Sequence, residues 1–205
     1  MEENRKEVDR LIDALDKSAN ANTYWLTLPI SDSIDTRKLG RDLINLLELG
    51  DFHNEMVRED IYRELGDYTE YVFTEGMDEP ILKPKPGNVW NGKEVLKMSS
   101  LAKIEAKNLL NDILTNGQKY FSKSSLGTAL DQEEASKIID AFFTSLDRVG
   151  TWIAVNIKPN FLNTTEDYEN SNHTILGYFE NSQRDFALGF VFKNHMNILL
   201  VNGYG

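Results

Sequence analysis

The chain has 205 residues, with 33 acidic against 22 basic side chains and a formal net charge of −11. It contains no cysteine, which excludes disulfides, thiolate metal sites and a cysteine nucleophile and fits a reducing compartment. The N-terminus lacks the apolar run of a secretory signal, and the longest aliphatic run, Ile198–Val201, is far shorter than the roughly 20 residues that cross a bilayer, so we expect a cytoplasmic protein that does not enter a membrane.

The N-terminal segment predicts a helix followed by a strand. Glu2–Ser18 carries apolar residues at helical spacing and is expected to form an amphipathic helix with one buried stripe. Tyr24–Leu28 is rich in strand-forming residues and is followed by Pro29, which is typical of a strand end or a sheet edge. We expect a short strand there.

Two further helices are expected, and a glycine follows each of them. The first is capped by Asp35 or Thr36 and ends at Gly50, where glycine suits the left-handed conformation of a helix C-terminus. The second spans Phe52–Leu65 and ends at Gly66 in the same way. Its predicted buried side is formed by Val57, Ile61 and Leu65.

The middle of the chain is the least regular part. Tyr68–Thr74 predicts a strand, and residues 75–97 then contain three prolines, which indicates a long loop. Such a loop could divide the chain into two lobes, but neither half shows an independent pattern, so we expect a single domain over residues 1–205. Ser99 or Ser100 is expected to cap the next helix, which ends at Asn116-Gly117.

The strongest helix prediction is Asp131–Val149, because Asp131 and Glu134 have capping-box spacing and Gly150 closes the segment. The last quarter then predicts four strands: Thr151–Ile157, His173–Glu180, Asp185–Lys193 and Met196–Asn202.

Apolar residues alternate along these strands and occupy both of their faces. Phe186, Leu188, Phe190 and Phe192 share one face, while Ala187, Gly189 and Val191 leave the other face small enough for close approach by a neighbour. Strands that are apolar on both faces are buried on both faces. The predicted fold class is therefore α+β: a C-terminal antiparallel sheet of about four strands packed against amphipathic helices, with one or two further short strands from the N-terminal half.

No catalytic or cofactor motif is present in the sequence. The three histidines, His53, His173 and His195, are scattered and form no zinc signature. The sequence also contains no calcium loop, no nucleophile elbow and no phosphate-binding glycine loop. We expect neither a metal nor a cofactor.

Charge is the one uneven feature of the sequence. Residues 51–80 carry 10 acidic and 2 basic side chains, a net charge of −8, whereas residues 81–125 carry 3 and 8, a net charge of +5. The acidic segment is either a solvated face or an electronegative surface for a basic partner protein, which would also disfavour nucleic acid. The candidate partner-binding residues are Glu55, Glu59, Asp60, Glu64, Asp67, Glu70, Asp78 and Glu79, together with Trp90 in the lysine-rich loop. The alternative role of Trp90 is structural: its side chain would pin this loop to the core.

The function expected from these features is that of a small acidic cytosolic binding protein that neutralises or inhibits a partner. Immunity proteins, antitoxins and phage-type inhibitors are comparable in class only. The alternative is a hydrolase or transferase whose carboxylates meet in a cleft beside the sheet, which a buried carboxylate pair with raised pKa next to a pocket would support. A structural subunit with a large exposed apolar patch is a third reading.

Overall fold

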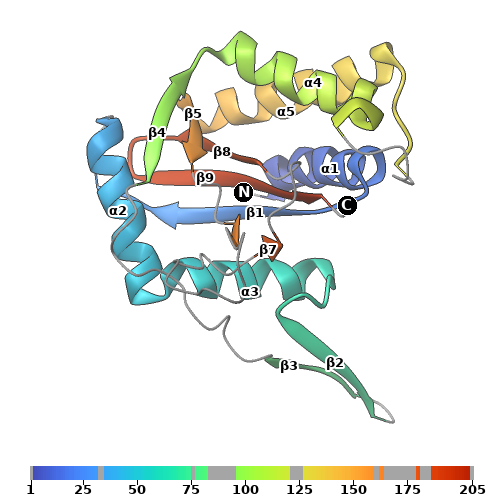
Figure 1. The fold of residues 1–205 in the computed structure, drawn as a ribbon, viewed down its shortest axis with the longest axis vertical. Coiled ribbons are helices and arrows are strands. Elements are labelled where there is room, and N and C mark those ends of the chain that lie inside the picture. Colours follow the sequence, from blue (N-terminus) through green and yellow to red (C-terminus); the bar gives the residue numbers. More distant parts are fainter. Residues whose placement is uncertain are drawn as a thin grey trace, which may run out of the picture.

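The computed structural model describes residues 2–31, 35–74, 77–82, 96–120, 127–158, 162–163, 179–180 and 186–203. In these ranges the predicted α+β class is confirmed: a five-stranded antiparallel sheet lies between two layers of helices (Figure 1). The strands of the sheet, in spatial order, are β1 (Ala21–Pro29), β9 (His195–Gly203), β8 (Phe186–Val191), β5 (Ile153–Lys158) and β4 (Lys97–Leu101).

The first and last strands of the chain are neighbours in this sheet. β1 pairs with β9 along its whole length, from Ala21 opposite Gly203 to Pro29 opposite His195. One strand expected in the sheet is placed elsewhere: β7 (Phe179–Glu180) pairs in parallel with β6 (Leu162–Asn163), apart from the main sheet. The remainder of that expected strand, residues 173–178, lies outside the described residues. The N-terminal strand β1 thus takes a place in the C-terminal sheet.

The helices bury both faces of the sheet, as the two-sided apolar pattern predicted. α1 (Glu2–Ala19), α4 (Lys103–Tyr120) and α5 (Gln132–Val149) pack on one face, where Phe142 of α5 lies 5.4 Å, centroid to centroid, from Phe190 of β8. α2 (Thr36–Leu49) and α3 (Asp51–Arg63) pack on the other. Leu188 and Phe190 enter the first core, whereas Ala187 and Val191 enter the second.

The predicted caps are confirmed at three helix ends. The Asp35 carboxylate accepts a hydrogen bond of 2.9 Å from the Arg37 backbone N–H at the start of α2, and Gly50 ends this helix with a φ of 86°. At α5 the Asp131 carboxylate accepts a hydrogen bond of 2.8 Å from the backbone N–H of Glu134. These contacts satisfy backbone groups that a helix leaves free at its ends.

The expected start of α4 is wrong. Ser99 and Ser100 do not cap a helix, because both lie in β4 and pair with β5. The helix begins at Lys103, and Glu105 accepts a hydrogen bond of 2.7 Å from the Ala102 backbone N–H. The helix was expected to end at Asn116-Gly117, but it is only kinked there. Asn116 has a φ of −128°, and the helix continues to Tyr120.

Of the three residues expected on the buried side of the α3 segment, Val57 and Leu65 are half-buried and pack against the core, but Ile61 is not buried. The buried residues of this helix include Phe52, Met56, Glu59 and Asp60, whereas Ile61 is 37% exposed. The helix ends at Arg63, and Glu64 adopts the left-handed conformation with a φ of 55°. The large side chains of Phe52 and Met56 fix this orientation, which turns two carboxylates inward.

β2 (Thr69–Thr74) and β3 (Met77–Leu82) form an antiparallel hairpin, called the arm below, that projects from the body of the molecule (Figure 1). β2 agrees with the expected strand, whereas β3 replaces the start of the expected loop. Ile81 and Leu82 on the arm are 53% and 63% exposed. Residues 83–95 of the expected loop, with Trp90, lie outside the described residues.

Gly189 provides a test of the tight packing predicted for β8. A Cβ at this position would lie 2.6 Å from Cγ2 of Val155, its cross-strand partner, and 3.1 Å from Sδ of Met196. We expect Gly189→Ala to lower the free energy of unfolding by about 1–3 kcal/mol because it overpacks the core. In a Val155→Ala background, which removes the nearest methyl, the added cost should be smaller. Equal costs in both backgrounds, measured by urea unfolding, would contradict this explanation.

Candidate functional site

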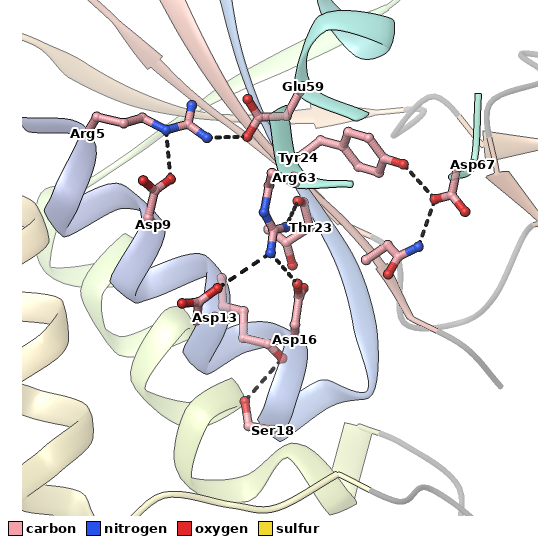
Figure 2. Close-up of polar contacts among 12 residues, drawn as sticks. Arg5, Asp9, Asp13, Asp16, Ser18, Thr23, Tyr24, Glu59, Arg63 and Asp67 are labelled. Carbon is pink, nitrogen blue, oxygen red and sulfur yellow. Dashed lines mark hydrogen bonds and ion pairs between the residues drawn. The ribbon is translucent and has the colours of Figure 1, made fainter. Parts of the chain in front are cut away.

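Most of the acidic side chains of α3 that were expected at the surface belong to a network around β1, the edge strand of the sheet. We call the six charged residues that join α1 to α3 across this edge the clasp (Figure 2). They are Arg5, Asp9, Asp13, Asp16, Glu59 and Arg63.

Arg63 is the centre of one half of the clasp. Its guanidinium donates a hydrogen bond of 2.5 Å to the backbone carbonyl of Thr23 on β1 and another of 2.8 Å to the Asp16 carboxylate on α1. Asp13 lies 3.6 Å away on the same helix. One side chain of α3 therefore binds both the edge strand and the helix on the opposite face of the sheet.

Arg5 is the centre of the other half. Its guanidinium binds Asp9 at 2.7 Å and Glu59 at 2.6 Å, and it lies 4.3 Å above the centroid of the Tyr62 ring. The Tyr62 hydroxyl donates a hydrogen bond of 2.9 Å to Asp9. This arrangement joins the N-terminal half of α1 to α3 through charge and ring contacts.

The buried carboxylates of the clasp have shifted pKa values. Burial raises the pKa of Glu59, and the hydrogen bond and charge of Arg5 oppose this effect. Burial also raises the pKa of Asp16, and this effect is opposed by the nearby Thr23 hydroxyl and by the charge and hydrogen bond of Arg63. Burial alone would lower the pKa of Arg5, yet its contacts with Glu59 and Asp9 raise it.

Asp60 organises the chain between α3 and the arm. It is fully buried, and its carboxylate accepts hydrogen bonds from the backbone N–H groups of Asp67 at 2.9 Å and Tyr68 at 3.2 Å, and from the hydroxyl of Thr69 at 2.5 Å. The Tyr24 hydroxyl donates to Asp67 at 2.5 Å. Because Thr69 is the first residue of β2, Asp60 fixes the base of the arm.

These contacts divide the predicted partner-binding residues into two groups. Glu59 is 6% exposed and Asp60 is fully buried, so neither carboxylate lies on the surface where we expected it. Asp67 is bound by Asn22 and Tyr24, and Glu55 is ion-paired with Arg58. The physical reason is that α3 lies against β1 and α1, which supply donors for its carboxylates.

The other predicted residues lie at the end of α3, on the arm or outside the described residues. Glu64 is exposed at the end of α3. Glu70 belongs to β2, and Asp78 and Glu79 belong to β3, so all three are on the arm. Trp90 lies outside the described residues.

An open groove of about 770 Å³ borders the clasp, and sequence reasoning missed it. We call it the α1 groove, because most of its lining comes from that helix. The signal in the sequence was the helical spacing of the basic residues of α1. The lining residues are Arg5, Lys6, Asp9, Arg10, Asp13, Ala14, Lys17, Tyr62, Leu130, Glu134 and Ile138.

Burial also raises the pKa of Glu55. The three carboxylates with raised pKa, Glu55, Glu59 and Asp16, do not line this groove but are paired with arginines. In the described ranges no three His, Cys, Asp or Glu side chains are grouped so as to hold a metal ion. None of the helices in the part of the chain that the structure describes is long and apolar enough to span a bilayer. No protein-family model matches the chain, and neither the curated proteins nor the solved structures contain a significant match.

Asp60→Ala tests the role of this carboxylate at the base of the arm. The change leaves the donors of Asp67, Tyr68 and Thr69 without their acceptor, so we expect the free energy of unfolding to fall by roughly 3–5 kcal/mol. Asp140→Ala removes an exposed carboxylate that pairs with Lys107 and should change it by no more than about 0.5 kcal/mol. Comparable losses in the two variants, measured by urea unfolding, would contradict the assignment.

The double variant Asp16→Asn/Glu59→Gln tests the balance between burial and ion pairing in the clasp. Burial raises the pKa of both carboxyls in the folded state, so above about pH 4 the folded protein binds more protons than the unfolded chain. The stability that these groups add at low pH is lost as the pH rises through their folded pKa values. The free energy of unfolding of the native protein minus that of the variant should therefore decrease from about pH 4 to pH 7. A difference that increases with pH would mean that the arginines outweigh burial.

Proposed function

We propose that this is a cytoplasmic binding protein that neutralises a basic partner protein, and that the arm is its main contact surface. The observation that carries the proposal is the exposure of Ile81 and Leu82 on a hairpin that projects from the body (Figure 1). Large exposed apolar side chains grouped on one projection are characteristic of an interaction surface.

The composition of the arm favours a basic partner. Glu70, Asp78 and Glu79 lie on its two strands, and the whole chain has a net charge of −11. An acidic surface accelerates encounter with a basic protein and repels nucleic acid. Contact with Ile81 and Leu82 would then supply apolar burial, which charge alone does not provide.

The way in which the arm is attached supports the same function. An isolated two-stranded hairpin is marginally stable in water, but Asp60 holds the turn before β2 through three hydrogen bonds. A base fixed in this way lowers the conformational entropy lost on binding. The buried acids of α3 thus contribute by positioning the arm rather than by touching the partner.

The enzyme alternative lacks its supporting observation in the described residues. It requires a carboxylate pair with raised pKa beside a pocket, whereas Glu59 and Asp16 are paired with Arg5 and Arg63 and lie outside the lining of the α1 groove. We therefore place binding ahead of catalysis.

The triple variant Glu70→Gln/Asp78→Asn/Glu79→Gln tests the proposal. The immobilised native chain should capture a basic protein from the part of a lysate that a cation exchanger retains, and the variant should capture roughly tenfold less of it, since three charge contacts are lost. Ile81→Ser/Leu82→Ser should weaken capture as well, because it removes the apolar contact. Capture is quantified by mass spectrometry at two salt concentrations, and loss at high salt is expected for the native chain.

The matched control is Glu48→Gln/Glu133→Gln/Asp140→Asn, which removes three exposed negative charges from α2 and α5. Its capture should equal that of the native chain. If control and arm variants lose capture to the same extent, net charge rather than the arm is responsible and the proposal is wrong. Circular dichroism verifies that every variant is folded.

A further inference from the structure

The α1 groove is locally basic although the protein as a whole is acidic. Lys6, Arg10 and Lys17 are exposed, and none of them forms an ion pair with another described residue. Of the groove carboxylates, Asp9 is bound by Arg5 of the clasp, and Asp13 lies 3.6 Å from Arg63 but is 65% exposed. Three available cations therefore stand against two exposed carboxylates of the lining, those of Asp13 and Glu134.

The three cations form a straight row. Positions 6, 10 and 17 of a helix lie within about 40° of one another around its axis, and they are separated by roughly 6 Å and 10 Å along it. The row therefore extends over roughly 16 Å. A compact anion would meet one of these side chains, whereas an elongated ligand would meet all three.

Apolar side chains also contribute to the lining of the groove. Ala14 and Ile138 are buried, Leu130 is half-buried, and Tyr62 is 58% exposed. The segment that carries Leu130 is held in place because its N–H donates a hydrogen bond of 2.8 Å to the carbonyl of Leu114. The lining of the groove thus combines apolar and basic side chains.

We propose that the α1 groove binds an acidic amphipathic helix of a protein partner. A helix whose acidic residues are four and seven positions apart presents its carboxylates at the same spacing as the cations of α1, and its apolar face contacts Leu130 and the exposed Tyr62 ring. A nucleic acid would place its phosphates near the row, but its sugar-phosphate backbone offers no apolar face to these two side chains. This surface is distinct from the arm and has the opposite charge preference.

The probe is a labelled helical peptide of alanine, leucine and glutamate. Its glutamates are four and seven residues apart in either order, so that it matches the row in a parallel or an antiparallel orientation. Fluorescence anisotropy should show binding to the native full-length protein and no binding of the same peptide with lysine in place of glutamate. Lys6→Glu/Arg10→Glu/Lys17→Glu should weaken binding of the acidic peptide by about tenfold or more, since three ion pairs become repulsive.

Arg37→Glu/Lys38→Glu/Arg41→Glu is the matched control, because it changes the net charge equally on α2, which covers the other face of the sheet. It should retain the affinity within about twofold. Failure of the acidic peptide to bind the native protein, or an equal loss in both triple variants, overturns the proposal. So does groove-dependent binding of a single-stranded RNA oligonucleotide without binding of the peptide. None of these outcomes bears on the arm, whose variants leave the groove unchanged.

Discussion

The contact between Arg63 and β1 is the one on which the N-terminal half of the molecule depends. An edge strand exposes backbone groups that can pair with another chain, and here Arg63 binds the carbonyl of Thr23 at that edge. Because the same guanidinium also binds Asp16, α3 on one face of the sheet is tied to α1 on the other. The clasp therefore occupies one backbone carbonyl of the free edge and ties both helical layers to β1 with a small number of charged groups.

The packing of α3 against β1 determines which acidic side chains of α3 are buried. Once α3 lies against β1, Glu59 and Asp60 are inside the protein, and each requires donors to remain there. Arg5 provides them for Glu59, while the chain that leads into β2 provides them for Asp60. The buried acids of the acidic segment thus hold α3 and the base of the arm in place.

The elements that the sequence predicts correctly are those with strong local signals. The cap at Asp131 and the alternation around Phe190 follow from local chemistry and a two-residue period, and both are confirmed. Ser99 and Ser100 mislead because serine suits a helix cap, yet pairing with β5 decides their conformation. The inward face of α3 could not be read locally either, because carboxylates at positions 59 and 60 are tolerable only when distant residues such as Arg5 supply partners.

α1 carries its charged side chains in stripes. Its buried stripe includes Leu11 and Leu15, its acidic residues Asp9, Asp13 and Asp16 pair with arginines of the clasp, and its basic residues Lys6, Arg10 and Lys17 line the groove beside Asp9 and Asp13. Stripes of this kind follow from helical periodicity, but segment-wise counting of charge averages them away. The Asp13 carboxylate is 65% exposed, so the row of cations has one exposed acidic neighbour on the same helix. The net charge of −11 describes the field of the whole molecule at long range, whereas the local row of cations sets the potential beside α1.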